Sequence, residues 1–311
     1  MRIVSLLSSG TEILFALGLG ELVLAVSHEC DFPPAARELP RATRSWIDSS
    51  LPSGQIDDQV KLRLAAGQPL YDLDAELICR LAPDLVVTQA QCDVCAVRHA
   101  DVVDLVRARP ELRSAGVVAL NPQSLDDVLA DIGRIGRAAE AASAAEALIE
   151  SLRRRIDCIA SRTAKLPEAA RPRVVCIEWV EPLMAAGNWT PGLIDLAGGR
   201  SGLAVPGRHS GYISPDELSE FDPEVLLIAP CGFDLARSRQ EAARLAQLPG
   251  FGELSAVKTG RAFVLDGNAY LNRSGPRLVE SLEILAHLIQ PQLFGPPPLA
   301  GAWQPLRRAG F

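Results

Sequence analysis

The sequence predicts an α/β protein of two Rossmann-like lobes, each with a parallel sheet, joined by a single long helix. Short apolar runs alternate with helical patterns through residues 1–122, and the same alternation returns over residues 167–295. Between them, residues 123–166 carry one continuous amphipathic pattern. Alternating strands and helices are typical of a parallel sheet with helices on its faces.

The first lobe is predicted from four short runs of β-branched and aliphatic residues. These predicted strands cover residues 2–5, 22–27, 85–88 and 117–120. Helical patterns follow the first strand and precede the third and fourth, at residues 75–81 and 101–107. The order strand, helix, strand indicates a parallel sheet.

The connecting segment spaces its apolar residues at three and four, from Leu125 to Ile156. This spacing predicts one amphipathic helix. About 40 residues at 1.5 Å each extend roughly 60 Å, which is too long for the interior of one small domain. We therefore expect a rigid connection between the lobes.

The second lobe repeats a phrase of the first. Ala82-Pro83-Asp84 stands between a helical pattern and a buried strand, and Asp222-Pro223-Glu224 stands in the same place in the second half. The predicted strands are residues 174–179, 225–229 and 262–265, and the predicted helices are 191–197, 215–221, 240–245 and 275–289. Residues 296–311 are rich in proline and glycine and are expected to form a flexible tail.

Composition limits the function. The chain has 311 residues, of which 48% are hydrophobic, enough for two cores. A net charge of −7 argues against nucleic acid as a partner, and no apolar run reaches the roughly 18 residues of a membrane span. We expect a monomer that binds a small molecule and is not an enzyme, because no catalytic motif is present.

The location is predicted from the first residues and the cysteines. Ser8, Ser9, Thr11 and Glu12 interrupt the stretch where a secretory signal would have an unbroken apolar core. Seven cysteines, an odd number, do not resemble a disulfide framework. We therefore expect a cytoplasmic protein, or a periplasmic one if a leader precedes residue 1.

Two loops leave the predicted carboxyl edge of the first sheet, where ligands bind in open parallel sheets. The loop after residue 26 holds His28, Glu29 and Cys30, and the loop after residue 88 holds Gln91, Cys92 and Cys95. His28, Cys30, Cys92 and Cys95 would suit zinc or an iron–sulfur cluster, and Cys92 with Cys95 would suit redox exchange. Buried structural thiols are the equally open alternative. His28 alone could be an axial ligand to a cofactor metal, or a hydrogen-bonding loop residue.

Aromatic residues also gather in predicted loops. They are Phe32, Trp46, Trp189, Tyr212 and Tyr270. In a chain with only 5% aromatic residues, this placement suggests a flat apolar face for a ligand to stack on. For any one of these residues, a structural role in closing the edge of a lobe is an equally open alternative.

Several phrases resemble the substrate-binding proteins of ABC importers in the cobalamin and iron-siderophore class, most closely the vitamin B12-binding members. The matching phrases are Arg2-Ile3-Val4-Ser5-Leu6, Asp31-Phe32-Pro33-Pro34, Leu81-Ala82-Pro83-Asp84-Leu85-Val86, Ile213-Ser214-Pro215-Asp216-Glu217-Leu218 and Arg273-Ser274-Gly275-Pro276-Arg277. The resemblance runs from residue 1 to about residue 295. Residues 51–71, beside Trp46, form an insert that it does not account for.

The resemblance implies a class III periplasmic-binding-protein-like fold that holds cobalamin or a related corrinoid in the cleft between the lobes, for ABC-type uptake or cytoplasmic storage. It places Trp46, Tyr212 and Tyr270 near aromatic ligand-binding positions. It also matches Glu76 and Asp216 to acids that dock onto a permease. The alternatives are a ferric-siderophore or haem-binding protein, and a redox protein with a metal or iron–sulfur cluster on His28, Cys30, Cys92 and Cys95.

Overall fold

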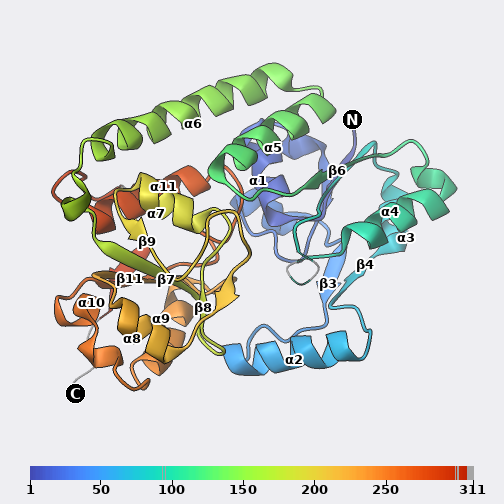
Figure 1. The fold of residues 1–311 in the computed structure, drawn as a ribbon. Coiled ribbons are helices and arrows are strands. Elements are labelled where there is room, and N and C mark those ends of the chain that lie inside the picture. Colours follow the sequence, from blue (N-terminus) through green and yellow to red (C-terminus); the bar gives the residue numbers. More distant parts are fainter. Residues whose placement is uncertain (93, 95, 298, 300, 307–311) are drawn as a thin grey trace. The chain divides into compact units, whose positions relative to one another are not determined.

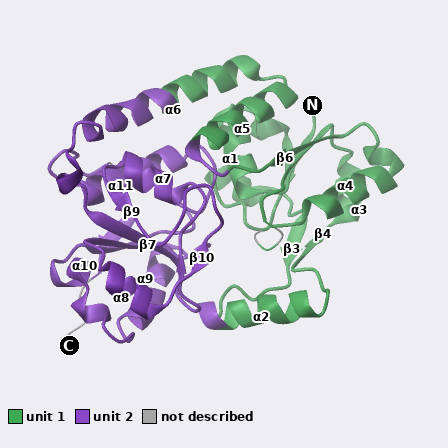
Figure 2. Ribbon diagram, in the orientation of Figure 1, with its two compact units in different colours: residues 1–51, 55–122, 126–152 green, residues 52–54, 123–125, 153–311 purple. Residues whose placement is uncertain are grey.

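The computed structural model describes residues 1–92, 94, 96–297, 299 and 301–306. The chain forms two compact units, each with its own core (Figure 2). Unit 1 comprises residues 1–51, 55–122 and 126–152, and unit 2 comprises residues 52–54, 123–125 and 153–311.

Unit 1 is built on a parallel sheet of strand order β2-β1-β5-β6. Its strands are β1 (Ile3–Ser5), β2 (Val23–Val26), β5 (Leu85–Gln89) and β6 (Gly116–Leu120). All four predicted strands are confirmed within a residue or two at each end. The core beneath them holds Val4, Leu6, Ile78, Val86 and Leu112, all at most 1% exposed.

The helices of unit 1 are labelled in Figure 1. They are α1 (Ser8–Ala16), α2 (Ser53–Ala65), α3 (Ala75–Leu81), α4 (His99–Ala108) and α5 (Leu125–Ala138), with 3-10 turns at Gly20–Leu22, Pro34–Glu38 and Pro110–Leu112. Local chemistry sets some of their ends. The carboxylate of Asp74 accepts the backbone N–H of Leu77 and caps the start of α3.

A second, two-stranded sheet of unit 1 carries the insert. β3 (Thr43–Ser45) and β4 (Tyr71–Leu73) are antiparallel, and Ser45 pairs with Tyr71. The helix α2 occupies the connection between them. The insert that begins at residue 51 is therefore an ordered helix and strand.

The prediction of a single connecting helix is wrong, because this segment forms two helices. They are α5 and α6 (Ala142–Thr163), and between them lies Glu140, whose φ of 56° is in the left-handed region. Reversal at this turn lets α6 pack against α5 so closely that a Cβ on Gly136 would collide with Ala145. Periodicity alone did not reveal the break, because alanine-rich segments keep a helical pattern through a short turn. The boundary between the units falls within α6 (Figure 2).

Unit 2 has a mixed sheet of order β10-β8-β7-β11-β12-β13, with β9 beside β7. Its strands are β7 (Arg173–Trp179), β8 (Met184–Ala185), β9 (Arg200–Ser201), β10 (Gly211–Tyr212), β11 (Val225–Ile228), β12 (Ala262–Leu265) and β13 (Trp303–Pro305). The predicted parallel sheet is confirmed for β7, β11 and β12. β8, β10 and β13 add antiparallel pairs that the sequence did not indicate.

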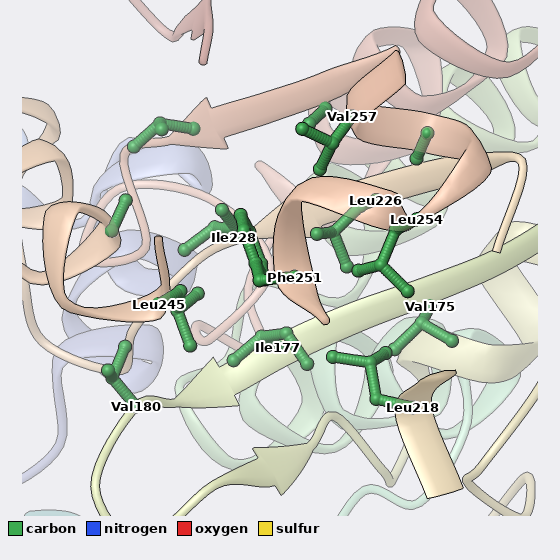
Figure 3. Close-up of a cluster of buried hydrophobic side chains, with 14 of the residues drawn as sticks. Val175, Ile177, Val180, Leu218, Leu226, Ile228, Leu245, Phe251, Leu254 and Val257 are labelled. Atoms are coloured by element: carbon green, nitrogen blue, oxygen red, sulfur yellow. The ribbon is translucent and has the colours of Figure 1, made fainter. Parts of the chain in front are cut away.

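The helices of unit 2 follow the predicted order. They are α7 (Thr190–Leu196), α8 (Pro215–Phe221), α9 (Leu235–Leu245), α10 (Ser255–Lys258) and α11 (Leu278–Ile289), with 3-10 turns at Glu168–Ala170 and Phe251–Glu253. α8 begins with a capping box, in which Ser214 and Glu217 satisfy each other's backbone N–H groups. Side chains from α8, α9 and α10 pack onto β7 and β11, where Val175, Ile177, Leu226 and Ile228 are fully buried (Figure 3).

The phrase shared by the two halves forms the same joint in both units. The residue before each proline, Ala82 or Asp222, is left-handed and ends a helix. The acid after the proline then binds the start of the neighbouring strand: Asp84 accepts the backbone N–H of Arg2 at 2.7 Å, and Glu224 accepts that of Arg173 at 2.9 Å. The repeated phrase thus sets the register of one strand pair in each unit.

The predicted tail is wrong for residues 303–305, which form β13 along β12. Trp303 packs edge-on against Phe263, with ring centroids 5.6 Å apart. Because this pairing is made with a strand about 40 residues earlier, the local composition gave no sign of it.

Candidate functional site

His28 lies just beyond the carboxyl end of β2, at the edge of the unit 1 sheet. Its Nδ1 atom is 2.7 Å from Oγ1 of Thr43, and its backbone N–H donates to the same hydroxyl at 2.9 Å. The Thr43 hydroxyl in turn donates to Oγ of Ser27 at 3.2 Å. We therefore assign the ring proton to Nδ1 and the lone pair to Nε2.

The environment keeps this imidazole neutral. Burial, with the charge of Arg41 as a smaller cause, lowers the pKa of His28 from 6.5 to about 4. Among the described residues, Nε2 has no hydrogen-bond partner. Oε1 of Glu29 lies 3.9 Å away on a half-exposed side chain. A neutral imidazole with an unused nitrogen can bind a transition metal once the side chains around it move.

Tyr71 is a site residue that the sequence analysis missed. Its ring lies 5.4 Å from that of His28, and its hydroxyl donates to the carbonyl of Val94 at 2.9 Å. Tyr71 thus joins the loop after β2 to the loop after β5. No signal in the sequence marks this contact, because Tyr71 reaches His28 only through the pairing of β3 with β4.

Trp46 follows β3 directly and is 44% exposed. Its backbone N–H donates to the carbonyl of Leu70, which holds it beside Tyr71. Two arginine side chains lie over its indole ring. Its role as a stacking surface for a ligand stays a prediction.

The other ligand candidates of unit 1 lie in the two loops. Glu29 and Phe32 are exposed in the loop after β2. Gln91 is half-buried in the loop after β5, where its side-chain amide donates to the carbonyl of Pro122. The buried side chain of Gln89 organises this loop through bonds to Cys92 and Val97.

The predicted metal cluster does not form in the described part of the chain. No group of three or more His, Cys, Asp or Glu side chains there could hold an ion. Cys30 is 1% exposed, with its Sγ 3.1 Å from Oγ1 of Thr11, and Sγ of Cys92 accepts the N–H of Val94 within its own loop. Cys30 thus lies in the interior of unit 1, and Cys92 lies in a hydrogen-bonded loop. Cys95 lies outside the described residues.

The predicted aromatic residues of unit 2 differ in their access to solvent. Tyr212, on β10, is 63% exposed. Tyr270 is half-buried, with the guanidinium of Arg277 5.8 Å from its ring. Trp189 is only 8% exposed and donates its indole N–H to the carbonyl of Leu271, so it fills the interior of unit 2. This burial argues against a contact between Trp189 and a ligand, which stays a prediction.

The two predicted docking acids are both exposed residues in the first turn of a helix. Glu76 lies in α3 and Asp216 in α8. Glu76 also borders a surface hollow of about 310 Å³ with Cys79, Arg80, Arg109 and Glu111. A docking role for either acid stays a prediction.

Two curated relatives match nearly the whole chain. An uncharacterized ABC transporter substrate-binding lipoprotein of Bacillus subtilis is 24% identical over 303 residues, which is 94% of this chain and 81% of the relative. A vitamin B12-binding protein of Vibrio cholerae is 23% identical over 284 residues, which is 91% of this chain and 86% of the relative.

Solved structures share the fold. A periplasmic haem-binding protein from Pseudomonas aeruginosa matches with a TM-score of 0.71 at 24% identity, over 98% of this chain and 97% of its own. The periplasmic vitamin B12-binding protein of Vibrio cholerae matches with a TM-score of 0.66 at 20% identity, over 93% of this chain and 96% of its own. The α/β fold of this class is therefore confirmed.

The predicted cytoplasmic location is wrong, because the relatives of this chain are lipoprotein or periplasmic binding proteins. The error arose because the compartment was inferred from the first residues and from the odd number of cysteines. Ser8, Ser9, Thr11 and Glu12 lie in α1 and Cys30 is buried in unit 1, so these residues serve the fold and do not report the compartment. Within the described residues, no helix has both the length and the apolar character needed to cross a bilayer.

The family can be named from a profile match as well as from these relatives. A profile described as "Periplasmic binding protein" matches residues 3–269, which spans both units. The resemblance seen in the sequence phrases is thereby confirmed over most of the chain. This chain belongs to the periplasmic binding protein family, whose members bind solutes and are not enzymes.

Proposed function

We propose that this protein is the ligand-binding component of an ABC importer and that its ligand is a metal-containing tetrapyrrole. A corrinoid such as cobalamin is the first candidate and haem is the second. Relatives and fold neighbours named for vitamin B12 and for haem support both.

The neutral imidazole of His28 carries the proposal. A corrinoid cobalt and a haem iron each accept an imidazole nitrogen as an axial ligand. The bond from Nδ1 to Thr43 fixes the tautomer and aims the ring, as second partners of metal-binding histidines do. Nε2 is buried in this structure, so a metal would reach it once the side chains around His28 move.

Absorption spectroscopy tests the proposal. We expect hydroxocobalamin or haemin to co-elute with the protein in gel filtration and to shift its visible bands. The variant His28→Ala should lose the shift, and His99→Ala, which removes another imidazole of unit 1, should keep it. Elution of both pigments apart from the wild-type protein would reject the tetrapyrrole. Displacement of a bound pigment by a ferric siderophore would favour the chelate class instead.

Docking onto a permease is the second part of the proposal. Glu76 and Asp216 are exposed acids, one on each unit, and a permease surface with arginines is the partner they fit.

A further inference from the structure

The loop that carries His28 is closed at its base against the end of β2. The backbone N–H of Val26 donates to the carbonyl of Pro40 at 2.9 Å, and the N–H of Ala42 donates to the carbonyl of Val26 at 2.8 Å. Residues 27–39 therefore leave and return at one point of the sheet, as in a compact surface loop. This loop contains three of the candidate ligand residues, which are His28, Glu29 and Phe32.

Arg41, at the base of this loop, donates hydrogen bonds to three carbonyls along it. Nη1 lies 3.0 Å from the carbonyl oxygen of Ser27 and 2.8 Å from that of Cys30, and Nη2 lies 3.2 Å from that of Arg37. Among the described residues Arg41 makes no ion pair, so its guanidinium is committed to the loop. One side chain thus ties together the start, the first turn and the far part of the loop.

Two of these three carbonyls flank His28. Ser27 precedes it, and Cys30 closes the turn in which it lies, since the N–H of Cys30 donates to the carbonyl of Ser27 at 3.1 Å. Cys30 is 1% exposed, so the turn is fixed on its inner side. Arg41 therefore holds the backbone of this turn, while Thr43 holds the imidazole ring.

The order of this backbone decides whether the imidazole can serve as a ligand. Fixing each residue of a loop costs conformational entropy, which specific contacts have to offset. The planar guanidinium suits this task, because its five N–H donors can bond several acceptors at once. A disordered turn would present His28 correctly in only a fraction of the molecules, and the apparent affinity falls by that fraction.

We propose that Arg41 is a positioning residue of the ligand site, which orders residues 27–39 so that the loop presents the imidazole of His28 to the metal of the ligand. The inference rests on the proposed tetrapyrrole function and adds a residue that acts through the loop backbone. Arg41 itself is not a ligand of the metal.

Three variants separate this role from a general effect on the loop. Arg41→Met removes the donors and keeps most of the aliphatic stem. Arg41→Lys keeps the positive charge and three donors on a single nitrogen, so it should restore part of the function. Arg37→Met is the matched control, because Arg37 is an exposed arginine of the same loop whose Nε donates to one carbonyl, that of Asp31, at 2.9 Å.

Titration of the visible bands of hydroxocobalamin and haemin measures the effect on binding. We expect Arg41→Met to raise the dissociation constant about tenfold, as for a loop that is ordered roughly one tenth of the time. Arg37→Met should bind as wild type does, and Arg41→Lys should lie between. At saturating pigment the bands of Arg41→Met should reach their wild-type position, because the same imidazole binds the metal. His28→Ala should not reach it at any concentration.

Hydrogen exchange without pigment measures the order of the loop directly. The amides of residues 27–39 should exchange roughly tenfold faster in Arg41→Met than in wild type or Arg37→Met. Those of the buried strand β5 should exchange equally in all three proteins, which shows that unit 1 remains folded.

Two results would overturn the inference: equal exchange of residues 27–39 in Arg41→Met and wild type, or equal losses of pigment affinity in Arg41→Met and Arg37→Met. An unchanged affinity of Arg41→Met for a pigment that wild type binds would also reject it. If wild type binds neither pigment, the tetrapyrrole function itself fails, and that outcome is distinct because it appears without any substitution.

Discussion

One hydroxyl group, Oγ1 of Thr43, fixes both the backbone and the ring of His28. The N–H of His28 donates to it at 2.9 Å, and Nδ1 lies 2.7 Å from it. Thr43 is itself 5% exposed and belongs to the small sheet that carries the insert. The position of the candidate metal ligand therefore depends on the pairing of β3 with β4.

Thr43→Val tests this dependence. The change keeps the shape of the side chain but removes the partner of two His28 groups and of Ser27. We expect the free energy of unfolding in urea to fall by about 1–3 kcal/mol. The spectral shift on binding a corrinoid or haem should also weaken. Thr43→Ser, which retains a hydroxyl, is the control, and equal stability of Thr43→Val and wild type would contradict the role of this hydroxyl.

The titration of His28 predicts how stability depends on pH. Its pKa is about 4 in the folded protein and 6.5 when unperturbed, so protonation favours the unfolded chain. The contribution to stability is complete above pH 6.5 and is lost as pH falls toward 4. The loss amounts to at most about 3 kcal/mol, because the ring is partly exposed and Glu29 and Arg41 lie near it.

Unfolding in urea at pH 7, 6, 5 and 4 measures this loss. His28→Gln cannot take up the proton, so its stability should change less than that of wild type across this range. Parallel curves for the two proteins would show that His28 is not the titrating group. His99→Gln serves as the matched control and should follow wild type.

Because residues 303–305 pair with β12, we expect them to stabilise unit 2. Trp303→Ala removes the edge-on contact with Phe263 and a second ring contact with His287, 5.5 Å away. We expect a loss of about 2 kcal/mol in the free energy of unfolding, since the side chain is half-buried. Gln304→Ala, on the opposite face of the strand, should change stability by no more than about 0.5 kcal/mol. Equal effects of the two would argue against packing by Trp303.

If Glu76 and Asp216 dock onto a permease, their removal should impair transport without changing ligand binding. With a reconstituted importer, Glu76→Ala combined with Asp216→Ala should reduce uptake roughly tenfold while leaving the affinity for the ligand unchanged. Glu146→Ala, an exposed acid on α6, is the control. Unchanged uptake by the double variant would remove these acids from the docking surface.

Much of the fold was predictable because its signals are local. The strands β1, β2, β5 and β6 are short apolar runs bounded by turns, and the capping residues Asp74 and Ser214 mark the starts of their helices. The phrase with Pro83 and its counterpart with Pro223 predicted two similar halves. Each of these signals lies within a few residues of the structure that it specifies.

The failures share one physical cause. The antiparallel strand β13 and the contact of Tyr71 with His28 depend on partners distant in the sequence, and the break at Glu140 depends on the packing of α6 against α5. Periodicity and composition describe only a segment's own preferences, and tertiary contacts decide between conformations that differ by little in local energy.

The order of helices and strands, the two-unit α/β class and the loop that holds His28 follow from the amino-acid sequence, because hydrophobic spacing and capping act over a few residues. The folded structure was needed to show that Thr43 aims the imidazole, that Tyr71 packs beside it, and that α2 brings the guanidinium of Arg63 over Trp46. These groups meet through strand pairing and helix packing, which no single stretch of the chain encodes.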